Sequence, residues 1–552
     1  MNYRKRTNSN KIIFSTGAFL FLIGFLGMIY NFWINPSDSA SDFLPTDTII
    51  LGEFKTSPQN IEKFGELGFL EGVEQILAKN LPNVKITDLQ PWLGKKIAFA
   101  WLPDKDFVFA GKYRSKNFAK KFIKKLLVPE EELVEKNFAG FTVYSPSFSS
   151  EMYFVFKDKW LIIASSKKAL ESILDDKPRL AQNSKFKEIS RDLSGPREIL
   201  GYVNFEKLVE NGFKLGKQKP LFKALAKTVP AFGLELETTN DELKINSKFL
   251  TTKGVFSTEL LQNTPHEIIP ELAQYAPKDV LFFLNGYDLH AKYSHTKKFL
   301  EETHPQFALI FDGVLRAGFK KLLGENFDFQ KDFLEKIHGQ YALILNFADK
   351  ENPFTYFTLI TGFGESIADE NNKKLQEIIK NAQQKYSTKV IEHKLPDGSI
   401  RQELVIVDSE KINIKEKEFQ SNTYYTTETK MDDEAANPQQ KFSYGFLNGF
   451  LVFSNHENGV RDVLKSFASK VNLTQNNDFR ENILFNLPAS ENYGFVNNNK
   501  LKILLKSKSD ADENSFISES ELRFLLEKFR TISLAKKTFT DATNLSVILR
   551  KR

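Results

Sequence analysis

The longest uninterrupted apolar stretch of the chain lies near its N-terminus. Residues 12–34 read IIFSTGAFLFLIGFLGMIYNFWI and contain no charged side chain. At 1.5 Å per residue, a helix of this length crosses about 30 Å of hydrocarbon. The alternative is a cleaved signal peptide, whose apolar region normally spans only about 7 to 15 residues. The pattern therefore favours a single, uncleaved transmembrane anchor.

The charges on either side of this stretch predict its orientation. Residues 1–11 contain Arg4, Lys5, Arg6 and Lys11 and no acidic residue, whereas Asp38 and Asp42 follow the stretch. Because basic residues are retained on the cytoplasmic side, residues 1–11 are predicted to be a cytoplasmic tail. Residues 35–43 are predicted to be a short linker. We thus expect a single-pass protein of the cell membrane with an extracytoplasmic C-terminal part.

Beyond the linker, short apolar runs alternate with polar turns. The run at 97–101 is followed closely by one at 107–110, and the run at 152–156 by one at 160–164. Such close pairs predict hairpins and hence antiparallel sheets. Helical spacing of apolar residues occupies 58–77 and 116–127. The fold class predicted is α+β, with antiparallel sheet covered on one side by helices.

The same pattern occurs twice in this part of the chain. WLIIAS at 160–165 returns as FLVFSN at 450–455, and GYVN at 201–204 returns as GFVN at 494–497. Offsets that only grow along the chain indicate two collinear copies. We therefore predict two divergent repeats joined by a connecting segment, with an insertion near 390–440 in the second: repeat one at 44–255, the connection at 256–275 and repeat two at 276–552.

Several segments of the first repeat resemble a known family. LPTDTIILGEF, DLQPWLGKKIAFAW and FVFAGKYRSKNFAKKFIKKL, followed by DKWLIIASSKKALESIL and GYVNFEKL, are similar to the bacterial family catalogued as domain of unknown function three-three-five-two. The similarity covers most of 44–255 and, more weakly, 276–552. The resemblance implies an anchored, extracytoplasmic protein of unassigned activity. It supplies no catalytic residues.

Composition excludes several classes of site. The chain contains no cysteine, which rules out disulfides, thiolate metal sites and thiol nucleophiles. The net charge of +6 derives largely from the four cations of the N-terminal tail, so no nucleic-acid partner is predicted. The sequence has no HExxH, GxSxG, P-loop or GxGxxG motif, and thus predicts no catalytic residues and no nucleotide cofactor.

One loop has the spacing of a calcium site. Residues 510–521 read DADENSFISESE, which resembles an EF-hand loop, although Ser515 replaces the glycine of the sharp turn. The alternative is a capping box formed by Ser518 and Glu521 before a helix. Calcium is thus a possible cofactor, and the candidate ligands are Asp510, Asp512, Asn514, the Phe516 carbonyl, Ser518 and Glu521.

A second candidate is a basic helix face, which is either a surface for anionic lipid or wall polymer or simply a solvated face over a buried one. It is made of Lys116, Lys120, Lys121, Lys124 and Lys125.

Two functions from different classes remain open. The first is a non-enzymatic binding or scaffold module of the cell envelope, with a lipid, polymer or protein partner. The second is an extracytoplasmic enzyme with a site between the two repeats. An open apolar groove would favour binding, and a closed pocket lined by convergent Asp, Glu, His or Lys would favour catalysis.

Overall fold

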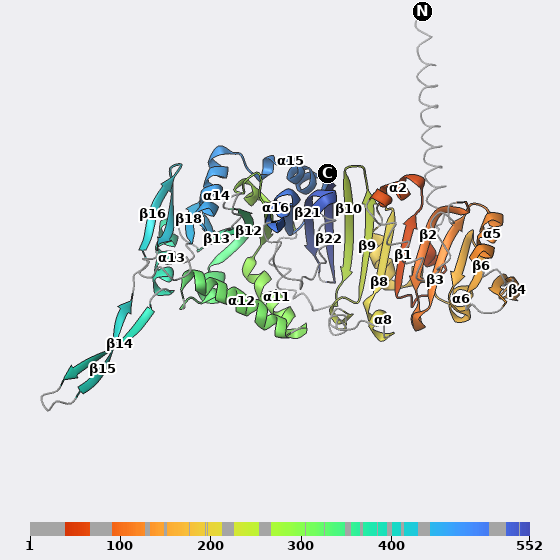
Figure 1. Ribbon diagram of the computed structural model, residues 1–552, viewed down its shortest axis with the longest axis horizontal. Coiled ribbons are helices and arrows are strands. Elements are labelled where there is room, and N and C mark those ends of the chain that lie inside the picture. The colour runs from red at the N-terminus through yellow and green to blue at the C-terminus, as the bar shows by residue number, and fades with distance from the viewer. Residues whose placement is uncertain are drawn as a thin grey trace, which may run out of the picture. The chain divides into compact units, whose positions relative to one another are not determined.

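The computed structural model describes residues 39–552, apart from 67–90, 127–132, 148–151, 176, 194, 196, 212–222, 224–225, 253–266, 304, 325, 348–354, 365–367, 383–384, 395–399, 410–412, 429–441, 507–525 and 540. The chain divides into two compact units. Figure 1 labels their helices and strands. Unit 1 comprises residues 1–54 and 86–187, and unit 2 comprises residues 55–85 and 188–552.

Unit 1 is a sheet in the order β1-β2-β3-β7-β6-β5-β4, and its pairs from β2 onward are antiparallel. Its centre is apolar, with Phe109, Phe154 and Trp160 fully buried. The elements are η2 (Ala40–Asp42), β1 (Ile50–Lys55), β2 (Leu93–Trp101), η3 (Pro103–Lys105), β3 (Phe107–Tyr113), α5 (Lys116–Leu126), β4 (Leu133–Phe138), β5 (Phe141–Pro146), β6 (Tyr153–Lys157), β7 (Trp160–Ala164), α6 (Lys167–Leu174), η4 (Leu180–Gln182) and the start of α7 (Ser184–Asp192).

Unit 2 holds the remaining elements. They are α2 (Pro58–Glu66), β8 (Ile199–Asn204), α8 (Phe205–Glu210), β9 (Ala231–Thr238), β10 (Glu242–Leu250), η6 (Glu271–Gln274), β11 (Phe282–Tyr287), α11 (Leu289–Thr303), α12 (Pro305–Leu323), η7 (Phe329–Leu334), β12 (Ile337–Phe347), β13 (Thr355–Phe363), α13 (Ala368–Ala382), β14 (Lys385–Lys394), β15 (Ile400–Ser409), β16 (Asn413–Phe419), β17 (Asn422–Glu428), β18 (Ser443–Leu447), β19 (Phe450–Ser454), α14 (Glu457–Ser469), η8 (Leu473–Gln475), α15 (Asn477–Phe479), η9 (Arg480–Asn486), β20 (Asn492–Asn497), α16 (Asn498–Lys506), β21 (Phe529–Thr538) and β22 (Ala542–Lys551).

One antiparallel sheet runs through unit 2 in the order β8-β9-β10-β22-β21-β20-β11-β12-β13-β19-β18-β17-β16. Strands β10 and β22, far apart in sequence, pair along their whole length, from Glu242 opposite Arg550 to Leu250 opposite Ala542. We call this pairing the seam. It joins the strands of residues 199–250 to those of residues 282–551.

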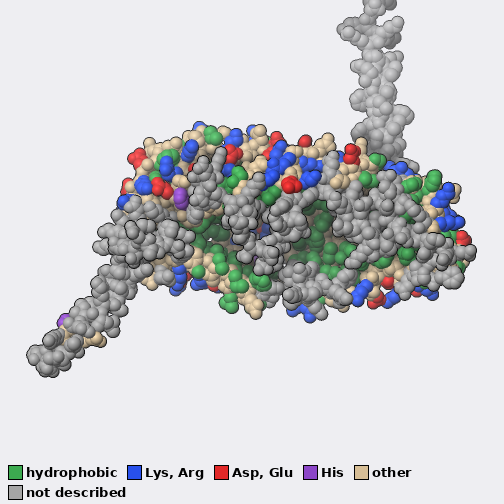
Figure 2. All heavy atoms as spheres, in the orientation of Figure 1, with side chains coloured by type: hydrophobic (Ala, Val, Ile, Leu, Met, Phe, Trp, Pro, Cys, Tyr) green, Lys and Arg blue, Asp and Glu red, His purple; other side chains and the backbone are tan. Residues whose placement is uncertain are grey.

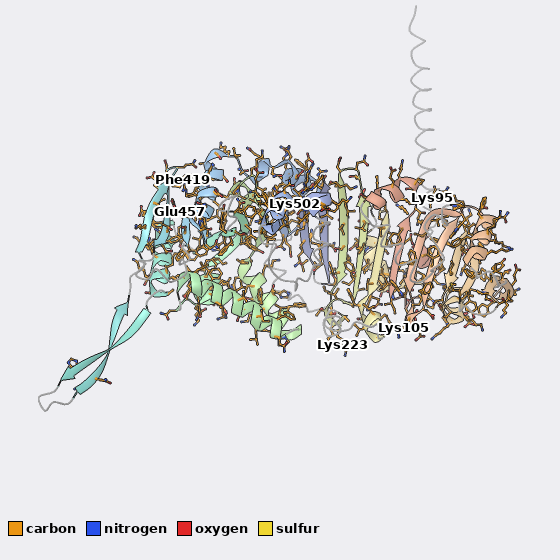
Figure 3. All side chains as sticks on the ribbon, viewed as in Figure 1. Lys95, Lys105, Lys223, Phe419, Glu457 and Lys502 are labelled. Atoms are coloured by element: carbon orange, nitrogen blue, oxygen red, sulfur yellow. The ribbon has the colours of Figure 1, made fainter. Side chains whose placement is uncertain are left out.

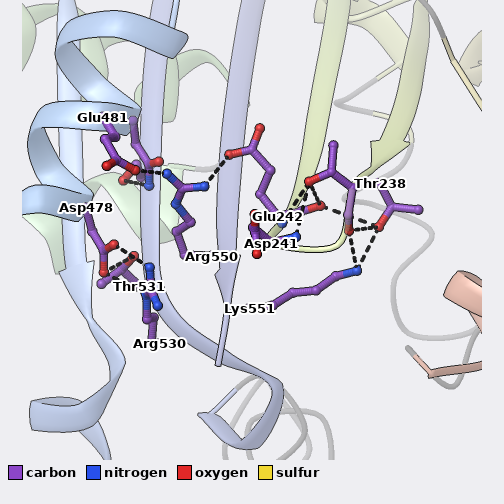
Figure 4. A network of polar contacts seen from close by, with 12 residues as sticks. Thr238, Asp241, Glu242, Asp478, Glu481, Arg530, Thr531, Arg550 and Lys551 are labelled. Carbon is purple, nitrogen blue, oxygen red and sulfur yellow. Dashed lines mark hydrogen bonds and ion pairs between the residues drawn. The ribbon is translucent and has the colours of Figure 1, made fainter.

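Polar contacts reinforce one end of the seam (Figure 4). The Arg550 guanidinium donates to Glu242 Oε2 of the neighbouring strand at 3.2 Å and also to Glu481. Lys551 Nζ reaches across β10 and donates to Thr238 Oγ1, at the end of β9, at 3.0 Å. Nearby, Arg530 donates to both carboxylate oxygens of Asp478, at 2.9 and 3.0 Å. These charge-assisted bonds hold the ends of β10, β21 and β22 in register.

Two apolar cores lie on opposite faces of the second half of this sheet. Phe283, Ile344 and Val452 pack with α14, whereas Tyr341, Leu359 and Phe453 pack with α13 and η7. Because neighbouring residues of a strand point to opposite faces, the alternation of Tyr341 and Ala342 between the two cores follows directly. Helices thus cover both faces here, whereas the sequence predicts one covered face.

The α+β class and the antiparallel hairpins are confirmed: β2 pairs with β3 and β6 pairs with β7. Strands β14 and β15 form a separate two-stranded sheet. Among the residues that the structure describes, no helix has the length and apolar character needed to cross a membrane. The predicted anchor at 12–34 lies outside the described residues.

Candidate functional site

One face of the unit 2 sheet is apolar across the seam. Register places Leu236, Ile245, Val547 and Leu534 in a single row, because residues opposite each other on paired strands share a face. The row continues through Gly494 to Leu284 on β11. We call this surface the apolar sheet face. It comprises Phe232, Leu234, Leu236, Leu243, Ile245, Phe249, Phe282, Leu284, Val496, Ile532, Leu534, Leu545 and Val547.

The two faces of these strands differ in burial. On the opposite face, Tyr493, Phe495, Ala535 and Ile548 belong to a buried core. Every residue that defines the apolar sheet face is instead only half-buried. Figure 2 shows hydrophobic side chains gathered in a hollow beside α11 and α12, in the middle of the view. A contiguous, partly exposed apolar surface of this kind is typical of a binding site.

A charged cluster lies at the edge of the apolar sheet face, where β20 and β21 meet α11. The Glu491 carboxylate is almost fully buried, with 2% of its side chain exposed. Its Oε1 accepts hydrogen bonds from Lys292 Nζ at 3.0 Å, Thr538 Oγ1 at 2.8 Å and Asn492 Nδ2 at 3.1 Å. The side chain of Lys292 comes from α11, so this cluster ties α11 to the sheet.

A second lysine adjoins this cluster. Lys536 lies opposite Leu545 and Asn492, so it shares the apolar sheet face. Burial lowers the pKa of Lys536, the positive charge of Lys292 lowers it further, and Glu491 opposes this effect. Burial likewise raises the pKa of Tyr341 to about 12. Two cations therefore share one carboxylate, which leaves this edge of the apolar face positively charged and suited to an anion.

We expect Lys536→Met to raise the free energy of unfolding at pH 7. Folding lowers the pKa of Lys536, so below that folded pKa its charged form destabilises the native state. This penalty disappears as the pH rises toward about 10.4, the pKa of an unfolded lysine. Denaturant unfolding at pH 7 and pH 10 measures the difference. Lys537→Met is the matched control, with an expected change within about 0.5 kcal/mol; a destabilised Lys536→Met protein would contradict the expectation.

A further polar group surrounds the start of α14 (Figure 3). Glu457 accepts hydrogen bonds from Tyr424 Oη at 2.6 Å and Lys417 Nζ at 2.9 Å, and these bonds hold the pKa of Glu457 below its usual range against the effect of burial. Arg461 stacks over the Phe419 ring at 4.8 Å. Each charge of this group has a partner of opposite sign or a ring, so the group stabilises α14 and suggests no reaction.

The residues predicted to bind calcium fall outside the described part of the chain. This applies to Asp510, Asp512, Asn514, Phe516, Ser518 and Glu521, so both the calcium site and the capping box stay predictions. In the ranges that the structure describes, no three His, Asp or Glu side chains are grouped so as to hold a metal ion.

The basic helix face lies on α5. Lys116 Nζ lies over the Phe156 ring at 5.2 Å, and Lys120 Nζ lies over Tyr144 at 5.2 Å. Tyr144 also raises the pKa of Lys120. These two lysines pack along aromatic side chains of the sheet, which is what a solvated face with buried stems requires. An interaction with lipid or polymer stays a prediction.

Sequence reasoning missed the apolar sheet face and the Glu491 cluster. Strands β9, β10, β21 and β22 carry an alternation of apolar residues that was visible in the sequence. The sequence of a strand does not show, however, whether its outward face is covered, because that depends on which helices reach it. Lys292, Glu491 and Lys536 are separated by 199 and 45 residues; the pairing of β20 with β21 and the packing of α11 bring them together.

The fold and this site define a class: an α+β protein built on a long antiparallel sheet with a half-buried apolar face. The family described as "Protein of unknown function (DUF3352)" matches residues 15–402. This match covers more than half of the chain, so the chain belongs to that family, as the sequence motifs predict.

Among curated proteins, nothing matches at a significant level. Two solved structures, crystal forms I and III of TP0453, give TM-scores of 0.26 and 0.25. Form I is 13% identical and covers 43% of this chain and 90% of its own; form III is 11% identical and covers 42% and 90%. Similarity at this level supports no conclusion about fold or function.

Proposed function

We propose that this protein is a membrane-anchored, extracytoplasmic binding module whose ligand is a lipid with an extended hydrocarbon chain and an anionic head. The observation that carries the proposal is the apolar sheet face with Lys536 at its edge. The row from Leu236 to Leu284 crosses six strands, which at about 4.8 Å per strand is roughly 24 Å. Such a surface suits a long hydrocarbon chain better than a compact substrate.

The charges support an anionic head group. Lys292 is already paired with Glu491, so Lys536 is the cation left to meet a ligand. A carboxylate or phosphate beside Lys536 would neutralise the second positive charge of the cluster and form a charge-assisted hydrogen bond with Lys536. The open apolar face also favours binding over catalysis, because the described residues here offer one buried carboxylate that is fully hydrogen-bonded at Oε1. The enzyme alternative has no comparable support.

The N-terminal anchor and the two repeats belong to the same proposal. Support for the repeats comes from strand order: β2-β3-β7-β6-β5-β4 has the same order as β12-β13-β19-β18-β17-β16. Trp160 opens β7 opposite Lys112 of β3, and Phe450 opens β19 opposite Gly362 of β13. Under this proposal the seam is where the last strands of the two copies pair.

The proposal is tested by photocrosslinking in the membrane. A long-chain fatty acid with a photoactivatable group in its chain is added to membranes that contain the full-length protein, and crosslinked peptides are identified by mass spectrometry. We expect crosslinks in β9, β10, β21 and β22. Val547→Trp fills the middle of the row with a larger apolar side chain and should reduce these crosslinks at least tenfold.

Controls separate this result from general contact with lipid. Ile269→Trp enlarges an exposed apolar residue outside the apolar sheet face and should leave the yield unchanged. Lys536→Met should weaken binding of the fatty acid roughly tenfold, which corresponds to about 1.4 kcal/mol, and leave a fatty alcohol unaffected. Crosslinks spread evenly over the chain, or equal yields from the wild type and Val547→Trp, would refute the proposal.

A further inference from the structure

Helix α12 carries large apolar side chains on a surface that no described element covers. Leu309 is 76% exposed, Ile310 is 60% exposed and Val314 is 65% exposed. Between Pro305 and Gly318 the charged residues of α12 are Asp312 and Arg316, which pair with each other. Contiguous exposed aliphatic side chains of this kind lower solubility unless they meet an apolar partner. This surface, which we call the α12 outer face, therefore calls for a specific occupant.

The charged residues in the middle of α12 point toward α11 instead. Asp312 accepts hydrogen bonds from Tyr293 and from Arg316 Nε at 2.8 Å, and it pairs with Lys297 Nζ at 3.3 Å. On the inner side, Phe311, Leu315 and Phe319 pack against the buried core. The helix is therefore apolar on two sides, and its fixed polar contacts hold the outer face in one orientation.

The charge around this face selects the kind of occupant. Residues 289–323 contain six Lys or Arg and three Asp or Glu. Because Lys292 is paired with Glu491 outside this segment, the six cations face four carboxylates once Glu491 is included, a net charge of +2. Lys298 and Lys320 are exposed on the two helices, together with Glu301. An exposed aliphatic surface with a basic surround matches the interface of an anionic bilayer, where apolar side chains enter the acyl region and lysines meet head groups.

We infer that the α12 outer face lies on the surface of an anionic lipid bilayer, with α12 parallel to the membrane plane. This contact uses residues different from those of the apolar sheet face and stands without the proposed function. It would be a second membrane contact besides the predicted anchor, and it would orient unit 2 with α11 and α12 toward the bilayer.

The absence of cysteine from the chain makes a sharp test available. A single cysteine is introduced into the full-length protein as Ile310→Cys, labelled with an environment-sensitive fluorophore, and reconstituted into vesicles of phosphatidylglycerol and phosphatidylcholine. We expect quenching by lipids that carry a quencher near the head group, and little quenching by aqueous iodide. The matched control is Ile269→Cys, at a residue 70% exposed, which should show the reverse.

Three further arms decide between occupants. In vesicles of phosphatidylcholine alone, quenching by the lipid-attached quencher should fall at least threefold. These vesicles have no net negative charge to attract the lysines around the α12 outer face. Leu309→Glu with Val314→Glu should abolish this quenching, and both positions are exposed, so folding is retained. Protection from iodide that depends on protein density, without quenching by lipid, would mean that a second copy covers the face and would overturn the inference, as would equal signals from both labelled positions.

Discussion

Replacing Glu491 by Gln is expected to lower the free energy of unfolding by about 3 kcal/mol. The substitution keeps the size of the side chain but removes the buried negative charge, which leaves Lys292 and Lys536 as neighbouring cations without a carboxylate between them. Removing one partner of a buried ion pair typically costs about 3–5 kcal/mol. Guanidinium unfolding followed by circular dichroism measures the loss, because all four tryptophans, at 33, 92, 101 and 160, lie outside unit 2.

A control at an exposed pair sets the scale for this loss. Glu267 pairs with Lys537 Nζ at 2.8 Å, but 60% of the Glu267 side chain is exposed. Glu267→Gln should therefore cost about 0.5 kcal/mol or less. Adding Lys536→Met to Glu491→Gln should recover part of the stability, since one buried cation is then removed. A cost for Glu491→Gln no larger than that of the control would show that the cluster is not held by its charge.

The second large effect is expected at the seam. Ile548 is fully buried on β22, which pairs with β21 on one side and β10 on the other. Ile548→Pro removes a backbone N–H from a central strand and inserts a ring into the ladder. We expect it to cost about 3 kcal/mol more than Ile548→Ala, which removes a similar part of the side chain but keeps the N–H, and itself costs about 2–5 kcal/mol.

Denaturant unfolding of the two variants isolates the contribution of the backbone. Limited proteolysis then locates the damage, because opening of the seam should expose β9 and β10 to cleavage while β12 and β13 stay protected by their two cores. Equal stability of the proline and alanine variants would mean that β22 does not pair on both sides, and the apolar sheet face would then be interrupted between Ile245 and Val547.

Sequence reasoning reached the fold class because the relevant signals are local. The polar turn between the apolar runs of β2 and β3 fixes an antiparallel hairpin, and the helical spacing at 116–127 correctly places the start of α5 at Lys116. The pairing of β10 with β22 was out of reach for the same reason. It joins residues about 300 positions apart, and no turn between them records the pairing.

The candidate site shows the same limit more strongly. An alternating strand such as 242–250 predicts one apolar face, and the usual expectation is that this face is buried. Whether a helix reaches this face depends on the position of α11, which contacts the sheet through Lys292 and Glu491 and packs on a core through Tyr293. The calcium-like loop, by contrast, was found in the sequence because all of its candidate ligands lie within twelve consecutive positions.

The seam also determines when β10 can form its second strand pairing during synthesis. The partner of β10 on one side is β22 (Ala542–Lys551), so that edge of β10 stays unpaired until β22 has been synthesised. Throughout that time, an exposed strand edge beside a partly uncovered apolar face is open to pairing with other chains. Rapid synthesis of the segment between β10 and β22 would shorten this exposure, and a chaperone that shields β10 would prevent it. A truncation of even the final strand would leave that edge exposed permanently.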